Sequence, residues 1–164
     1  MKRARSSGTI RWRTARATAL NEAVWSLAGL FAAAFGAATL LPFQSEIVFV
    51  AVQLRGEAAL WAILLVASVG NVLGSVVNYA IGRGVDRFKG GRWFPVGEVA
   101  LARAQDWWHR WGVWTLLLSW APMGDAFTVV AGMMRTPVWL FVLLVAVAKT
   151  GRYAVLAAAT SGVL

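Results

Sequence analysis

The sequence of 164 residues contains no cysteine, which excludes disulfide bonds and thiolate metal sites. Charge is also scarce: only 14% of residues are charged, where a soluble domain has about a quarter. Residues 24–41 and 58–81 carry no charge at all. An uncharged, mostly apolar run of about 18 or more residues can cross a bilayer as a helix, which satisfies its own backbone hydrogen bonds in lipid. The sequence therefore predicts an all-α membrane protein.

Positive charge is the exception, with a net charge of +9. The basic residues gather in the N-terminal segment and in a middle loop, beside the apolar blocks rather than within them. They include Lys2, Arg3, Arg5, Arg11, Arg13 and Arg16, then Arg83, Arg87, Lys89, Arg92, Arg103 and Arg110. Lipid head groups and the positive-inside bias favour this distribution. We therefore expect membrane lipids, and no nucleic acid, as partners.

Catalytic signatures are absent from the sequence. The single histidine, His109, has no second or third metal ligand nearby, and the glycines at 82 and 84 lack the spacing of a phosphate loop. No nucleophile accompanies the carboxylates. We expect no metal, no cofactor and no enzymatic activity, with an intramembrane enzyme as a minor alternative.

The chain divides into a basic arm over residues 1–20, expected to be disordered, and a single membrane domain over 21–164. Helices are predicted over 21–41, 45–54, 58–81 and 138–163, and an apolar segment covers 113–134. Ser45 stands where it can cap the N-terminus of the second helix. A basic loop over 82–112 carries an amphipathic helix in its second half.

Two of the apolar segments are broken. Pro42 interrupts the first, and Pro122 with Gly124 interrupts the later one, because proline cannot continue a helical backbone ladder. Each break is followed by an acidic residue, Glu46 or Asp125, and then by a spanning helix. Duplicated interrupted segments of this kind mark transport sites in carriers built from inverted repeats. We predict a re-entrant hairpin over the later segment and a weak internal repeat of the two halves, with chance similarity between the halves as the alternative.

The amphipathic helix carries apolar and charged residues at helical spacing. Ala100, Ala104, Trp107, Trp108 and Trp111 are expected on one side, and Arg103, Asp106 and Arg110 on a separate side. A helix with this pattern tends to lie in the bilayer interface.

The carboxylates are the strongest functional candidates. A carboxylate at membrane depth is costly when ionised, so Glu46 and Asp125 are candidates to carry protons. Their alternative role is to complement the dipole at a helix N-terminus. Lys149 and Arg152 lie three residues apart on one helix face, with Glu46 and Asp125 or a lipid phosphate as partners, or they form a structural ion pair. Arg135 is either a topology anchor or a two-pronged phosphate ligand.

The third helix carries a polar stripe with small residues beside it. The stripe contains Ser68, Asn71, Ser75 and Asn78, and the small pair is Gly70 and Gly74. Such a face favours helix packing with interhelical hydrogen bonds, with direct substrate contact as the alternative.

Four short passages suggest a family. They are Ala38-Thr39-Leu40-Leu41-Pro42 with Ser45-Glu46; Gly70-Asn71 with Gly74 and Asn78; Leu117-Leu118-Ser119-Trp120 with Pro122 and Gly124-Asp125; and Lys149 with Gly151-Arg152-Tyr153. In this order and spacing the chain resembles the YqaA group of the DedA (VTT-domain, SNARE-associated) membrane proteins, over about residues 24–160.

The resemblance implies hairpins that enter from opposite membrane faces, each with an acidic residue near its tip. It also implies transport of lipids or ions across the bacterial inner membrane. By position, Glu46 and Asp125 match the family's acidic residues, and Arg135 matches a basic residue of the second hairpin. We expect a multi-pass transporter of an anionic lipid, a polyprenyl phosphate or a phospholipid, coupled to protons; a homo-oligomer is left open. The alternatives are a proton-coupled carrier of small ions or solutes, and a non-transporting scaffold.

Overall fold

The computed structural model describes residues 6–39, 44–84, 97–121 and 124–162, and all regular structure within them is helical. The elements are α1 (Ser6–Thr39), α2 (Ser45–Arg55), α3 (Leu60–Arg83), α5 (Glu98–Trp111), the 3₁₀ helix η1 (Gly112–Leu118), α6 (Gly124–Met133) and α7 (Val138–Ser161). The all-α fold predicted from the sequence is confirmed.

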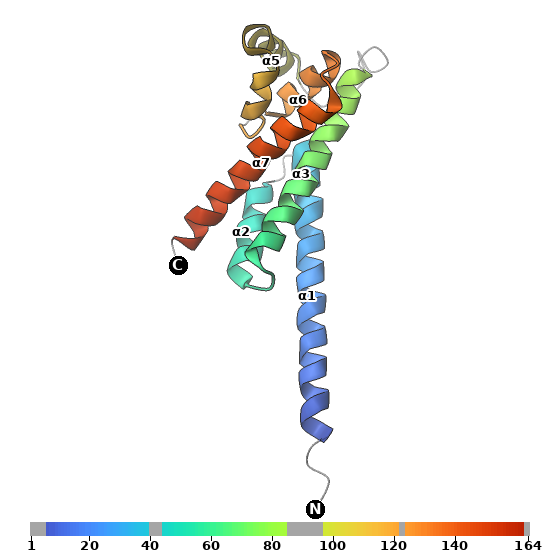
Figure 1. The fold of residues 1–164 in the computed structure, drawn as a ribbon, viewed down its shortest axis with the longest axis vertical. Helices are drawn as coiled ribbons and strands as arrows, with labels where there is room; N and C mark the ends of the chain where they lie inside the picture. Colours follow the sequence, from blue (N-terminus) through green and yellow to red (C-terminus); the bar gives the residue numbers. More distant parts are fainter. Residues whose placement is uncertain (1–5, 40–43, 85–96, 122–123, 163–164) are drawn as a thin grey trace, which may run out of the picture.

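Three helices are long and apolar enough to cross a membrane: residues Arg16–Thr39 of α1, all of α3 and all of α7. Each 24-residue helix is about 36 Å long at 1.5 Å per residue, enough for a hydrocarbon core of about 30 Å. In Figure 1, α3 rises along the bundle and α7 returns in the opposite direction. The chain is therefore built to cross the membrane several times.

The first helix begins earlier than the sequence suggested. It starts at Ser6 rather than near residue 21, so residues 6–20, expected to form a disordered arm, belong to α1 in the structure. Propagating an existing helix adds one hydrogen bond per residue without a new nucleus, and the apolar part of α1 supplies that nucleus. The N-terminal half of α1 projects beyond the rest of the fold (Figure 1).

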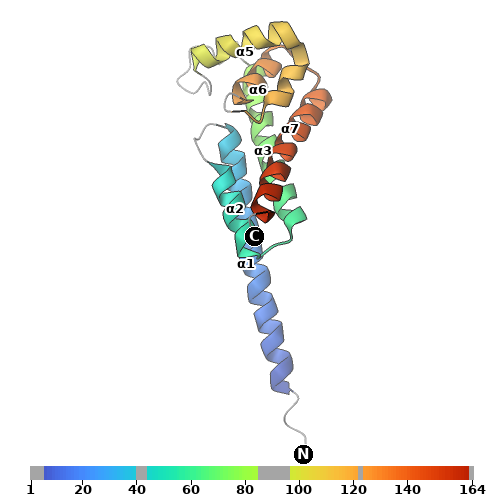
Figure 2. The ribbon, with the colours of Figure 1, turned by 90° about the vertical axis from the view of Figure 1, so that its left-hand side faces the viewer.

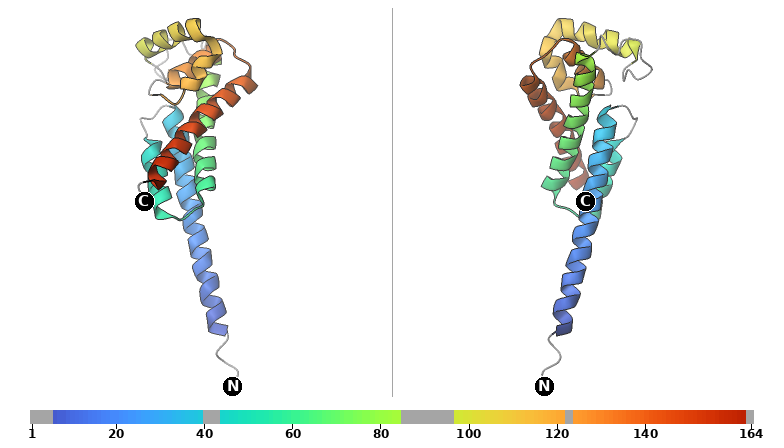
Figure 3. Two further views of the ribbon diagram at one scale, coloured as in Figure 1. Left: turned by 60° about the vertical axis from the view of Figure 1, so that its left-hand side comes forward. Right: turned by 90° about the vertical axis from the view of Figure 1, so that its right-hand side faces the viewer.

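The two halves of the fold share an order of elements. A short helix precedes a 24-residue helix in both: α2 before α3, and α6 before α7. Figure 3 shows α3 and α7 crossing the bundle in opposite directions, as an inverted repeat requires. Pro42 and Pro122 lie outside the described residues, so the re-entrant hairpins remain a prediction.

The later broken apolar segment begins with a 3₁₀ helix, η1. Gly112 ends α5 with a positive φ of 56°, which interrupts the helical ladder. The hydroxyl of Thr115 then donates to the Gly112 carbonyl at 2.8 Å and holds the tighter turn.

Helix α3 lies against α1 and α6 with its backbone unusually close to theirs. A Cβ atom added at Gly74 would lie 2.6 Å from the carbonyl oxygen of Phe35, and one at Gly82 would lie 2.0 Å from that of Val129. Only glycine permits such contact. Asn78 adds a hydrogen bond of 2.7 Å to the backbone of α1.

Two separate hydrophobic cores lie along the bundle. One surrounds the stacked rings of Phe49 and Tyr153, and the other surrounds Tyr79 and Phe141, whose ring centroids are 4.6 Å apart. Helices α3 and α7 pass from one core to the other. Near their midpoints the sequence changes from apolar to polar, and there the candidate site lies.

Candidate functional site

A cavity of about 430 Å³ lies near the middle of the bundle, where α2, α3, α6 and α7 approach one another. Its lining residues are Ala37, Gln44, Ser45, Glu46, Asn71, Ser119, Ala121, Asp125, Lys149 and Arg152. Asn71 and Lys149 are each close to the centre of their 24-residue helix. The cavity therefore lies near the middle of both helices.

Two ion pairs cross the cavity. Lys149 Nζ lies 3.6 Å from Asp125 Oδ1, and Arg152 pairs with Glu46. The Lys149 side chain is 6% exposed and that of Asp125 is 43% exposed. Both cations come from one face of α7, whereas the acids come from two different short helices. The structure thus brings together four of the five charged residues singled out from the sequence.

A chain of hydrogen bonds joins the first ion pair to α2. Lys149 donates to Asn71 Oδ1, Asn71 Nδ2 donates to the Tyr153 hydroxyl at 2.9 Å, and that hydroxyl donates to Ser45 Oγ at 2.9 Å. Every bond in the chain has a defined direction because the lysine can only donate. The amide of Asn71 does not titrate, so this series of hydrogen bonds positions the four side chains rather than conducting protons.

Ser45 does not cap α2, as its position in the sequence suggested. Gln44 occupies the N-cap position without a side-chain hydrogen bond, and Ser45 is the first helical residue. Its hydroxyl oxygen accepts a hydrogen bond from the hydroxyl of Tyr153 on α7. A tertiary hydrogen bond has therefore displaced the local capping bond.

Arg135 is the charged candidate that the structure leaves outside the cavity. It follows α6 in the turn toward α7, its side chain is exposed, and its φ of 53° places it in the left-handed region. Its amide donates to the Gly132 carbonyl at 3.0 Å and closes that turn. The geometry gives it a role at the end of α6, and the phosphate-binding role implied by family resemblance stays a prediction.

The polar stripe of α3 divides between two environments. Asn71 lines the cavity, whereas Asn78 bonds to the Ala38 carbonyl, and Gly70 and Gly74 face α1. Helix packing is thus shown for Asn78, Gly70 and Gly74, and substrate contact by Asn71 stays a prediction. Sequence reasoning gave no role to Ser119, which also lines the cavity. No periodicity marks Ser119, because η1 is not an α-helix.

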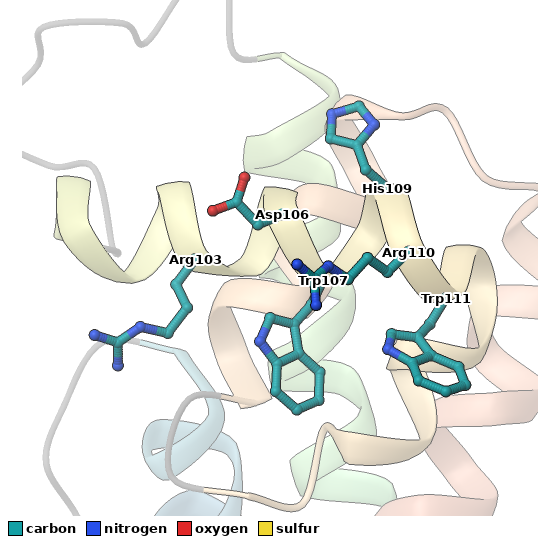
Figure 4. A pocket seen from close by; sticks show the side chains of 6 residues that line it. All are labelled: Arg103, Asp106, Trp107, His109, Arg110 and Trp111. Carbon is teal, nitrogen blue, oxygen red and sulfur yellow. The ribbon is translucent and has the colours of Figure 1, made fainter.

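A second cavity, of about 790 Å³, lies along the amphipathic helix α5. This helix crosses one end of the bundle roughly perpendicular to α3 (Figure 2). Figure 4 shows the rings of Trp107 and Trp111 directed to the same side as Arg103, with Asp106 and His109 on the opposite side.

The expected separation of tryptophans from basic residues on α5 is wrong. Trp108 and the fully buried Ala104 pack into the core, whereas Trp107 and Trp111 are exposed. Arg103 stands four residues before Trp107 on the same face. The outer face of α5 is thus aromatic and basic together, and it lies apart from the ion pairs.

Membrane-length helices around two ion pairs in a central cavity define a polytopic membrane protein with an internal polar site. The family model for the VTT domain matches residues 41–162, so the chain belongs to the VTT-domain family, as its sequence motifs indicated. It is 40% identical over 136 residues to inner membrane protein YqaA of Escherichia coli, covering 82% of this chain and 91% of that protein. The Shigella flexneri protein of the same name gives the same values.

A protein of Haemophilus influenzae, named only as uncharacterized, is 34% identical over 139 residues, which cover 80% of this chain and 85% of that protein. No solved structure matches the chain.

Proposed function

We propose that this VTT-domain protein is an inner-membrane transporter that moves an anionic lipid, a polyprenyl phosphate or a phospholipid, together with protons. The observation that carries the proposal is the pairing of two cations with two carboxylates in one cavity at the middle of the bundle. Intramembrane charges of this kind mark substrate and proton pathways. The inner-membrane location follows the name of the Escherichia coli relative.

The charge balance of the cavity gives the proposal its mechanism. Glu46 and Asp125 neutralise Arg152 and Lys149, so the net charge of the two ion pairs is zero. A phosphate that entered would be a buried charge without a partner, which is costly. Protonation of a carboxylate breaks its ion pair and releases one cation to the phosphate. Protons and the anionic head group therefore load together, with one proton for each cation released.

The size of the cavity limits what enters it. About 430 Å³ falls within the range of small-ligand pockets, roughly 300–1,000 Å³, but a whole lipid is larger. Only the head group is accommodated, and the hydrocarbon chain stays in the bilayer. The aromatic and basic face of α5 suits the interface from which such head groups come.

A scaffold without transport activity is the second candidate. The observation in its favour is the close glycine-mediated packing of α3 against α1 and α6, which serves assembly alone. In a scaffold the ion pairs only lock helices together. Neutral amides in place of the carboxylates would then be tolerated.

The test is reconstitution into liposomes that contain a polyprenyl phosphate, with lipid translocation and proton flux measured together. Glu46→Gln and Asp125→Asn keep size and hydrogen bonding but remove the titration, so the double variant should lose proton-dependent lipid movement. Glu57→Gln and Asp106→Asn are the matched controls, since neither residue lines the central cavity. Full activity in the double variant would eliminate the proton-coupled mechanism. Proton flux without added lipid phosphate would indicate a small-ion carrier instead.

A further inference from the structure

The hydroxyl of Ser119 is a buried polar group without a hydrogen bond. The residue is 3% exposed, its Oγ has no partner among the described residues, and it lines the central cavity. An unsatisfied buried hydroxyl costs about 1–3 kcal/mol, so each one calls for an explanation. Ser68 on α3 has an unpartnered Oγ as well, but it does not line this cavity.

The backbone holds Ser119 in place. Its amide donates to the Leu116 carbonyl at 3.0 Å at the end of η1. Its own carbonyl packs against Gly124 so closely that a Cβ added there would lie 2.0 Å from the carbonyl oxygen. Gly124 precedes Asp125 directly. Ser119 is therefore fixed beside the acid of the second half and cannot move its hydroxyl far to find another partner.

Ser45 offers a second hydroxyl from the opposite short helix. It is 2% exposed and lines the same cavity. The Tyr153 hydroxyl accepts a hydrogen bond from Asn71 and donates its own hydrogen to Ser45 Oγ. Ser45 therefore accepts from Tyr153, and no described residue accepts the Ser45 hydrogen in turn. Both serines thus hold a free O–H donor at the cavity.

We propose that Ser45 and Ser119 are head-group ligands that donate to two oxygens of a bound phosphate, while Lys149 and Arg152 supply the charge. This inference rests on the proposed function, because it assumes an anionic head group in this cavity. Hydroxyl donors on two sides favour an anion with several acceptor oxygens. The serines therefore select phosphate over halide and over neutral lipid head groups.

The test measures binding of farnesyl phosphate to the full chain in detergent micelles, at a pH where the cavity acids are protonated, with farnesol as the neutral comparison. Ser119→Ala should raise Kd about tenfold or more, as expected for losing a hydrogen bond to a charged group, and Ser45→Ala should act similarly. Ser68→Ala removes an equally unpartnered buried hydroxyl outside the cavity and should leave Kd unchanged. Ser119→Thr, which keeps the hydroxyl, should retain binding.

Stability separates a ligand from a structural residue. Removing an unpaired buried hydroxyl should leave the unfolding temperature unchanged or raise it, so Ser119→Ala should bind worse without being less stable. If Ser119→Ala binds like Ser68→Ala while Lys149→Met loses binding, the serine assignment fails and the proposed function stands. If Lys149→Met and Arg152→Gln also bind farnesyl phosphate normally, the phosphate does not occupy this cavity. The serine assignment and the proposed function then both fail.

Discussion

Replacing Lys149 with methionine tests the central ion pair directly. The substitution keeps the length of the side chain but removes the cation 3.6 Å from Asp125. Breaking a buried pair by removing one partner costs about 3–5 kcal/mol. The side chain of Asp125 is 43% exposed, so water solvates the unpaired carboxylate or a proton neutralises it. We expect the lower end, about 3 kcal/mol.

The double variant Lys149→Met with Asp125→Asn removes the uncompensated charge as well. Replacing both members of a buried pair is often neutral or stabilising, so the double variant should lie within about 1 kcal/mol of the native chain. The coupling free energy is the cost of the double variant minus the costs of both single variants, so it should favour the pair by at least about 2 kcal/mol, with the cost of Asp125→Asn adding to that figure. Tryptophan fluorescence during titration with sodium dodecyl sulfate in mixed micelles measures the free energies of unfolding. It is applied to the native chain, to each single variant and to the double variant.

Arg55→Met is the control, because Arg55 is an exposed cation at the end of α2, away from the cavity. It should change stability by less than about 0.5 kcal/mol. A double variant as unstable as Lys149→Met alone would refute the reasoning. It would mean that Lys149 stabilises the fold through some interaction other than the one with Asp125.

Two further predictions concern packing and proximity. Gly74→Ala should destabilise the chain by about 1–3 kcal/mol through overpacking against α1, whereas Gly151→Ala, with nothing within 4 Å of its Cβ position, should not; equal unfolding free energies would contradict the α1–α3 contact. Cysteines at Gln44 and Ala121, which line the cavity from the two halves, should cross-link with a short bifunctional reagent against a cysteine-free background. Gel electrophoresis detects the product, and failure with reagents of several lengths would place these residues apart.

The sequence was most informative where one physical requirement dominated. Long apolar runs must become helices in lipid, so α3 and α7 begin within a few residues of their predicted starts. The cost of intramembrane charge likewise singled out Glu46, Asp125 and Lys149. Which acid meets which cation did not follow from the sequence. That assignment depends on where each short helix lies along α7.

Other features depended on tertiary contacts that leave no periodic signal. Ser45 was expected to cap a helix, but Tyr153 competes for its hydroxyl. Ser119 lines the cavity from the turn that follows η1, outside any regular helix. Arg135 stays outside because the turn after α6 directs the chain away. Local propensity does not report any of these contacts.

The glycine contacts of α3 divide the fold mechanically. Backbone-to-backbone contact at Gly74 and Gly82 joins α1, α3 and α6 into one body that cannot shear without collision. Helix α7 has no such attachment, because nothing lies within 4 Å of the Cβ position of Gly151, its single glycine. Lys149 and Arg152 belong to α7, and Asp125 belongs to the joined body. A slide of α7 along its axis would therefore carry both cations together and separate Lys149 from Asp125, whereas Glu46 lies on α2, which is hydrogen-bonded to α7.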